Sequence, residues 1–200
     1  MDAQIVNQAR QFVEEYYDSH KSKSLHYHNL EHTRYVADAA ETIGKASGLN
    51  GEELEIALVA AWCHDIGHNE GDWPHEDASV RVTTGFLRSI GYPEKKISEV
   101  AACIYATRIP QAPENLMQQT LCDADMAHLA GDRYFEIAEK LRREISELSG
   151  RTISAEDWLK ENKEFFAAHR YFTSYARQTL QPLKDRNMLE LAARLSALVH

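Results

Sequence analysis

The stretch Ala61-Trp62-Cys63-His64-Asp65-Ile66-Gly67-His68 places three side chains that bind metals or carry protons directly after an apolar run that begins at Ile56. If residues 54–68 form one helix, His64 and His68 lie one turn apart and share a face. The short carboxylate of Asp65 could reach the same point. Because an unpaired charge is costly to bury, an ionised Asp beside an apolar run suggests a cation. For a His-Asp pair that stands alone, a solvated helix end with a pH-sensitive His is the alternative.

The composition favours a single helical domain. Two hundred residues allow one domain with a sizeable core, or at most two small ones. Nine glycines and five prolines are too few for a sandwich or barrel that turns every ten residues. The formal charge of -9 argues against long nucleic acid as a partner, because no basic stripe is present to neutralise phosphates. A small phosphorylated ligand is still compatible with this charge, since a local metal can dominate the field around a site.

The absence of a recognisable signal peptide and the use of cysteine both indicate a cytoplasmic protein. The N-terminal residues show no basic segment followed by an apolar one, so we expect no signal peptide. No stretch approaches the length of a membrane span, so we expect no membrane association. Cys63, Cys103 and Cys122 are odd in number and lack CxxC spacing. We therefore expect reduced cysteines in the core of a cytoplasmic protein.

Apolar residues at helical spacing recur along the whole chain, without a competing alternating run of β-branched residues. Asn29, Asn50 and Ser154 are suited to begin helices as N-caps. The pattern predicts an all-α fold in one domain over residues 1–200, with a metal-site core at about 25–130 and C-terminal helices at 132–200 that pack on it. The expected helices span residues 2–17, 29–47, 50–68, 75–90, 93–107, 114–130 (with a kink at 123–125), 132–148, 154–168, 170–180 and 183–199.

Two further segments offer candidate ligands beside apolar residues. His28 and His32 lie four residues apart at a helix start, and Asp123 and Asp125 lie inside an apolar helix. Buried acids are expensive unless they are paired, so a helix cap or an ion pair with Arg133 is the alternative for both of them. With the His-Asp doublet included, three separate helices each offer His or Asp. Helical bundles build metal sites in their cores in this way.

The order His32, His64-Asp65 and Asp125 resembles the HD superfamily of metal-dependent phosphohydrolases. That superfamily is defined by a His, a His-Asp doublet and a distant Asp on different helices of an all-α bundle. The flanking residues are similar too, both in Tyr-His-Asn-x-x-His-Thr at 27–33 and in Cys-His-Asp-Ile-Gly-His at 63–68. His-Glu-Asp-Ala-Ser at 75–79 resembles an element of a branch known mostly as predicted phosphohydrolases. The resemblance covers about residues 25–130.

The resemblance implies one divalent metal ion bound by His32, His64, Asp65 and Asp125. Mixed nitrogen and oxygen ligation without thiolate suits Mn, Mg, Fe, Co, Ni or Zn. Such an ion lowers the pKa of bound water and holds a phosphate for in-line attack. Dinuclear members of the superfamily add histidines well downstream of the doublet. Here only His68 and His75 follow before His128, so we expect a single ion.

The resemblance also suggests residues that act on the substrate, each with an ordinary structural alternative. His68 could be a general acid or orient water, or it could be a helix-end His bonded to a carbonyl. Glu76 could be a general base or support a His ligand, or it could be a surface residue. Tyr27 and His28 could line the phosphate pocket, although Tyr27 could instead be a core residue. Arg108 could bind a substrate phosphate, or it could be a surface residue. The expected set is Asp65, His68 and Glu76 as catalytic groups, with Tyr27, His28 and Arg108 as substrate-binding groups.

The function we expect is hydrolysis of a phosphate ester of a small molecule, for example a nucleotide, by metal-activated water. Mono- and diesterase action both stay open, as does the oligomeric state. One alternative is an HD module that senses a nucleotide without cleaving it, although all four ligand positions are intact. Another is an HD-type diiron oxygenase, which the missing downstream histidines disfavour.

Overall fold

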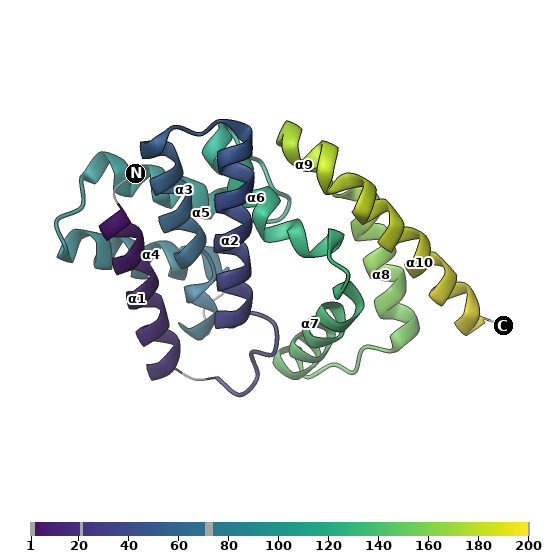
Figure 1. The fold of residues 1–200 in the computed structure, drawn as a ribbon. Helices are drawn as coiled ribbons and strands as arrows, with labels where there is room; N and C mark the ends of the chain where they lie inside the picture. Colours follow the sequence, from purple (N-terminus) through teal and green to yellow (C-terminus); the bar gives the residue numbers. More distant parts are fainter. Residues whose placement is uncertain (1–2, 21, 71–73, 200) are drawn as a thin grey trace.

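The computed structural model of the chain describes residues 3–20, 22–70 and 74–199. These residues form helices and connecting loops without any strand, so the predicted all-α fold is confirmed (Figure 1). Within the described residues, every helix is too short or too polar to cross a bilayer. The elements are α1 (Ala3–Ser19), α2 (Leu30–Ser47), α3 (Gly51–Cys63), η1 (Ile66–Glu70, a 3-10 helix), α4 (His75–Ser89), α5 (Glu94–Ala106), α6 (Leu116–Asp125), η2 (Met126–Ala130, a 3-10 helix), α7 (Tyr134–Ser149), α8 (Ala155–Ala168), α9 (Ser174–Thr179) and α10 (Gln181–Val199).

The main core is built around α3. Every residue from Leu54 to Cys63 is buried, as expected for a helix that is apolar on all sides. Helices α1, α2, α5 and α6 pack around it. A capping box begins α3, because the Asn50 side chain accepts the Glu53 N–H and the Glu53 carboxylate accepts the Asn50 N–H. This central helix delivers the His-Asp doublet into the interior of the bundle. The three cysteines are buried and free, as predicted.

A second cluster of apolar residues holds the C-terminal helices together. It contains Leu129, Tyr134, Ala138, Phe166 and Leu191. Helix α10 packs along α8 and η2, and the C-terminal helices lie to one side of the main bundle in Figure 1. The lower end of the same view shows α7 beside the loop that leads into α2. The arrangement places α7 and α8 next to the end of the bundle that carries the doublet.

A buried acid joins the two parts. Asp123 is fully buried, and its carboxylate accepts the Phe172 N–H at 2.7 Å and the Thr173 N–H at 2.8 Å. These bonds hold residues 170–173 outside any helix, and the Thr173 side chain then caps α9. The predicted helix over 170–180 is therefore wrong in its first part. Asp123 makes backbone hydrogen bonds rather than the alternative ion pair with Arg133, whose partners are Glu136 and Glu31.

The predicted continuous helix over residues 54–68 is also wrong. Helix α3 ends at Cys63, and the chain turns at the doublet before it forms η1. At Gly67 the backbone passes so close to α4 that a Cβ atom would lie 2.2 Å from the His75 carbonyl oxygen. The Gly67 N–H donates to the Ser79 hydroxyl at 2.9 Å. This close approach requires a residue without a Cβ atom at position 67.

Smaller differences concern helix ends. The expected helix over 114–130 is divided into α6 and η2 at Asp125, close to the predicted kink. Helix α7 begins at Tyr134, whereas the expected helix began at residue 132. Residue 2, expected in the first helix, and residues 71–73, expected in the break before α4, lie outside the described residues.

Candidate metal centre and adjoining pocket

The four expected ligands come together from three helices. Asn29 caps α2 through hydrogen bonds to the Glu31 and His32 N–H groups, which places His32 in the first turn. His64 and Asp65 follow the end of α3, and Asp125 ends α6. The Nε2 atoms of His32 and His64 each lie 3.2 Å from Asp65 Oδ2. They lie 3.4 and 3.7 Å, respectively, from Asp125 Oδ1.

The buried atoms of this first cluster fit a divalent cation. His64 is fully buried, and its Nδ1 donates to the Ala61 carbonyl at 2.9 Å. That bond keeps a proton on Nδ1 and directs Nε2 at the carboxylates, and Nε2 without its proton is the form that binds a metal. Among the described residues, His64 Nε2 and Asp65 Oδ2 have no hydrogen-bond partner. Unsatisfied buried polar atoms of this kind are costly unless something binds them. Two imidazoles and two carboxylates form a suitable ligand set for a first-row divalent ion or Mg²⁺.

The charges of this cluster depend on each other. Burial favours a lower pKa for His32 and His64, but the carboxylates of Asp65 and Asp125 outweigh it and raise the pKa of both imidazoles. Burial likewise favours a higher pKa for Asp65, but the positive charge of the neighbouring His64 lowers it well below the usual value. The carboxylates are thus held in the ionised form by protons on the imidazoles. A divalent ion would displace these protons on binding.

A second group of donors lies on the other side of Asp65. The ligand atoms of His28, Asp65 and His68 lie within 4.8 Å of one another, as do those of His32, His64 and Asp125. The second oxygen of Asp65, Oδ1, lies 3.3 Å from His75 Nε2 and 3.9 Å from His68 Nε2. The rings of His28 and His75 stack on opposite sides of His68, each with centroids 3.9 Å from it. The sequence pattern did not predict this grouping.

His68 is neutral in this environment. Burial, followed by the neighbouring His28, lowers the pKa of His68 to about 2. Its Nε2 is buried and has no hydrogen-bond partner in the described part of the chain. An uncharged ring with a free nitrogen is suited to bind a cation or to orient a water molecule. It is less suited to donate a proton as a general acid near neutral pH.

Glu76 and Arg108 lie at the rim of the site. Glu76, in the first turn of α4, is buried, so the surface alternative does not apply. Its carboxylate lies 3.4 Å from Arg108 Nε and 3.8 Å from His75 Nε2. Arg108 also contacts Asp77 at 3.1 Å, and its side chain is 43% exposed. The guanidinium is therefore held by two carboxylates but is open to a ligand.

The other side of the site is closed by Tyr27 and His28, together with Glu144 and His128. The sequence pattern did not identify the last two. Glu144 on α7 is almost fully buried and accepts the N–H groups of Tyr27 at 2.7 Å and His28 at 3.1 Å. It also contacts His28 Nδ1. His128 lies 3.2 Å from the Tyr27 hydroxyl through Nδ1, which is also 2.9 Å from the Asp125 carbonyl oxygen. A Glu three residues after Leu141, on the same face of the helix as this apolar residue, is the signal that could have identified Glu144.

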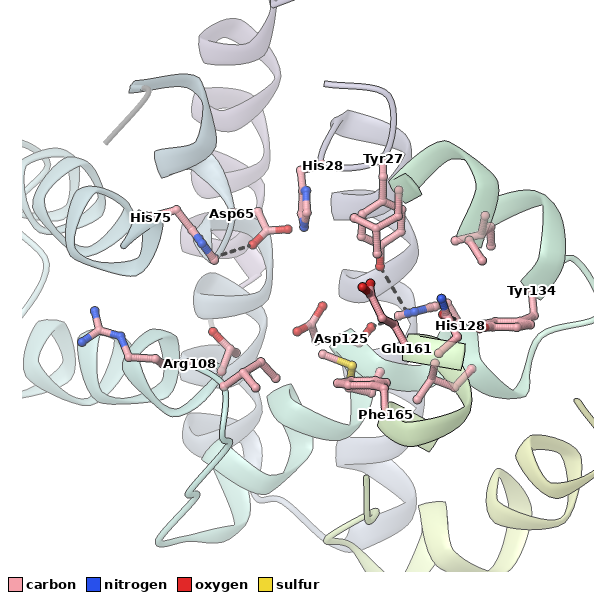
Figure 2. Close-up of a pocket in the computed structure, with 18 of the residues that line it drawn as sticks. Tyr27, His28, Asp65, His75, Arg108, Asp125, His128, Tyr134, Glu161 and Phe165 are labelled. Carbon is pink, nitrogen blue, oxygen red and sulfur yellow. Dashed lines mark hydrogen bonds and ion pairs between the residues drawn. The ribbon is translucent and has the colours of Figure 1, made fainter. Parts of the chain in front are cut away.

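A pocket of about 560 Å³ opens beside the first cluster. In Figure 2, Asp65, His75 and Arg108 lie at one end, Asp125 lies near the middle, and Tyr134 lies at the other end. Its size is typical of a site for a small molecule. The lining residues are Tyr27, His28, Asp65, Pro74, His75, Glu76, Thr107, Arg108, Ile109, Asp125, Met126, His128, Leu129, Tyr134, Ile137, Ala138, Leu141, Trp158, Glu161, Asn162 and Phe165.

Comparison with known proteins gives one family and two similar structures. The sequence pattern of the HD domain matches residues 29–198. A "predicted HD superfamily hydrolase" from an uncultured Thermotogales bacterium is 21% identical, with a TM-score of 0.60 over 98% of this chain and 92% of that one. A protein from Lactobacillus plantarum is 15% identical, with a TM-score of 0.71 over 99% and 96%. At these identities the likeness concerns the fold. No curated protein matches the sequence.

Proposed function

The chain belongs to the HD domain family, and from this premise we propose that it is a metal-dependent phosphohydrolase that acts on a phosphate ester of a small molecule. One observation carries the proposal. His64 Nε2 and Asp65 Oδ2 are buried in a cluster with His32 and Asp125, without a hydrogen-bond partner among the residues described. A nucleotide is the substrate that we propose to test first. The protein would act in the cytoplasm.

The residues present suit the chemistry that the ion would supply. A divalent ion held by His32, His64, Asp65 and Asp125 would acidify a bound water and neutralise phosphate charge. Arg108, at the mouth of the pocket, would bind a phosphate oxygen with its guanidinium, and Glu76 would keep that group in place. His68, which is neutral and buried, would orient the attacking water. Tyr27 and His28 would form the wall behind the phosphate.

Phosphate release is the direct test. We expect the purified protein, loaded in turn with Mn, Mg, Fe, Co, Ni or Zn, to hydrolyse at least one member of a panel of nucleotides, sugar phosphates and phosphodiesters, detected as inorganic phosphate from a monoester or as the new monoester from a diester. Release should stop with chelator and return with added metal, because the ion supplies the activated water. Tight binding of a nucleotide without turnover would favour the sensing module. Oxygen consumption by an iron-loaded sample would favour the oxygenase.

A second test measures the metal without any reaction. A bound ion stabilises the folded state by about 4 kcal/mol at about 1,000 times its Kd, which raises the Tm by about 10 °C in a protein of this size. We expect this rise in the wild type and no rise in Asp125→Ala. Metal analysis of the same samples determines the stoichiometry. One equivalent is expected from the first cluster, and any second equivalent should be lost in His68→Ala. If chelator leaves the wild-type Tm unchanged, the shared metal site is refuted.

A further inference from the structure

A second cavity of about 320 Å³ lies between the first two turns of α2 and those of α7. We call it the rear cavity. It shares three wall residues with the larger pocket, namely Tyr27, His128 and Ile137. It differs in that it borders His32, which the larger pocket does not. The rear cavity therefore reaches the metal centre from behind one of the expected ligands.

The His32 ring has one nitrogen atom without a partner among the described residues. Its Nε2 lies 3.2 Å from Asp65 Oδ2 and 3.4 Å from Asp125 Oδ1. The other nitrogen, Nδ1, has no hydrogen bond to any residue that the structure describes, yet unlike His64 Nε2 it is not fully shielded from solvent. The His32 side chain is 4% exposed, so this small accessible area opens on the cavity that the ring borders.

His64 shows the arrangement that His32 lacks. Its Nδ1 donates to the Ala61 carbonyl at 2.9 Å. A histidine that binds a metal through one nitrogen almost always donates its second N–H to a carboxylate, a carbonyl or water. Such a partner fixes the ring and makes it a stronger ligand. For His32, an acceptor in the rear cavity would supply the missing partner.

The mouth of the rear cavity carries two cations. Lys140 Nζ lies 3.2 Å from Glu31 Oε2, and Arg133 Nη1 lies 3.8 Å from Glu31 Oε1. The Lys140 and Glu31 side chains are 35% and 65% exposed, and ion pairs of this kind contribute little to stability. Another carboxylate can therefore take the place of Glu31 beside Lys140. Tyr35 and Ile137 add apolar surface to the lining.

We propose that the rear cavity binds a small monocarboxylate that accepts the N–H of His32 Nδ1 in the field of Lys140, and that this ligand strengthens metal binding at the first cluster. An ion on Nε2 makes the Nδ1–H a stronger donor, and a charged acceptor forms the stronger hydrogen bond with it. The inference goes beyond the proposed function, because it concerns metal affinity whatever reaction the ion supports.

Other occupants fit the rear cavity less well. A cation would be repelled by Lys140 and Arg133 and would leave the His32 N–H without an acceptor. A dianion would bring a second negative charge to a mouth that already holds Glu31 and Asp132. A neutral amide would accept the N–H but would gain nothing from the charge of Lys140. A monocarboxylate satisfies the inner donor and the outer cation together.

The first measurement is an NMR titration of the metal-free protein with propionate, so that the carboxylate cannot bind to an ion. Propionamide, which has nearly the same shape without the charge, is the matched ligand. We expect propionate to bind about tenfold more tightly than propionamide, because a hydrogen bond to a charged group is the stronger one. Equal binding of the two ligands, or no saturable binding of propionate, would overturn the proposal.

Variants at the mouth assign the binding to the rear cavity. Lys140→Ala should weaken propionate about tenfold, and Glu31→Gln should tighten it, because the competing carboxylate is removed. Lys160→Ala, which removes an exposed lysine paired with Glu156 on α8, is the control and should bind propionate like the wild type. Propionate binding that is the same in Lys140→Ala as in the wild type would place the ligand elsewhere and contradict the proposal.

The second measurement is the Kd of Mn²⁺, determined by calorimetry with and without saturating propionate. We expect propionate to lower this Kd about tenfold, the lower end of the range for a partner on the second nitrogen of a His ligand. By linkage, Mn²⁺ should tighten propionate by the same factor. Lys140→Ala should bind Mn²⁺ like the wild type when propionate is absent and should need about tenfold more propionate for the effect.

Direct binding of propionate to the ion gives a different result. It would also couple the two ligands, but it would persist unchanged in Lys140→Ala, and this outcome would overturn the proposal. A Kd of Mn²⁺ that is the same with and without propionate would do so as well. Both readouts are binding constants and require no substrate, so they separate this inference from the proposed phosphohydrolase activity.

Discussion

Asp65→Ala is expected to reduce metal-dependent phosphate release by at least about 1,000-fold, which corresponds to about 4 kcal/mol of transition-state stabilisation. Both oxygens of this carboxylate face candidate ligands. Oδ2 lies 3.2 Å from the Nε2 atoms of His32 and His64, and Oδ1 lies 3.3 Å from His75 Nε2. The substitution therefore removes one ligand from the first cluster and the carboxylate that the second group shares. Phosphate release and metal content, measured on the same sample, check this result.

The variant should also show how the charged cluster affects the stability of the metal-free protein. Burial alone would raise the pKa of Asp65, but the positive charge of His64 lowers it, so the ionised carboxylate stabilises the metal-free fold, and removing one partner of a buried ion pair is destabilising. We expect metal-free Asp65→Ala to melt below the metal-free wild type at neutral pH, while added metal no longer raises its Tm. Asp65→Asn keeps the shape without the charge and should behave alike. Asp38→Ala, at an exposed position on α2, is the control. A variant that kept metal-dependent release would refute the role of Asp65.

The sequence contained enough information to predict the all-α fold and to propose the first cluster. Helical periodicity and caps such as Asn29 and Asn50 are local features, and they predicted most helix positions. The ligands His32, His64, Asp65 and Asp125 lie on elements of the main bundle, and a family motif marks each of them. The helix end at Cys63 was missed because its cause is a tertiary contact. After this end Gly67 lies so close to α4 that a side chain there would clash with the His75 carbonyl, and only the tertiary structure shows this contact.

The second group of histidines and the pocket wall could not be predicted from the sequence. Both form only when the chain turns at the His-Asp doublet and when segments distant in the sequence come together. His28 is separated from His68 and His75 by a long stretch of sequence, and His75 stacks on His68 because η1 packs against α4. The residues of α7 and α8 that line the pocket form an ordinary amphipathic stripe in the sequence, which a core-facing helix would also show. The sequence pattern cannot distinguish an apolar face that borders a cavity from one that borders another helix.

Glu144→Ala is expected to impair both the stability of the fold and the geometry of the site. The carboxylate accepts the N–H groups of Tyr27 and His28 and contacts His28 Nδ1. Burial alone would raise the pKa of Glu144, but the hydrogen bond from His28 lowers it, so the group is ionised. Its removal leaves two N–H groups without their acceptor, with an expected loss of about 3–5 kcal/mol in the free energy of unfolding. Chemical denaturation measures this loss.

The effect on activity follows from the orientation of His28. A carboxylate on Nδ1 fixes the ring so that Nε2 is free for a ligand, and the loss of such a partner costs about 10–100-fold in metal affinity or activity. The cluster of His28, Asp65 and His68 is expected to lose this factor when Glu144 is replaced by Ala. Glu144→Gln keeps an acceptor for the backbone N–H groups and should restore most of the stability but only part of the activity. This difference separates positioning of His28 from simple loss of packing.

Glu147 on the same helix provides a matched comparison. It also pairs with a histidine, His26, and with Arg143, but its side chain is 38% exposed. Exposed ion pairs contribute less than about 1 kcal/mol, so Glu147→Ala should change the free energy of unfolding by no more than this and leave phosphate release unchanged. Equal losses in Glu144→Ala and Glu147→Ala would show that Glu144 has no special role. A large loss in Glu144→Ala alone, with partial rescue by Gln, would establish that α7 helps to build the site through His28.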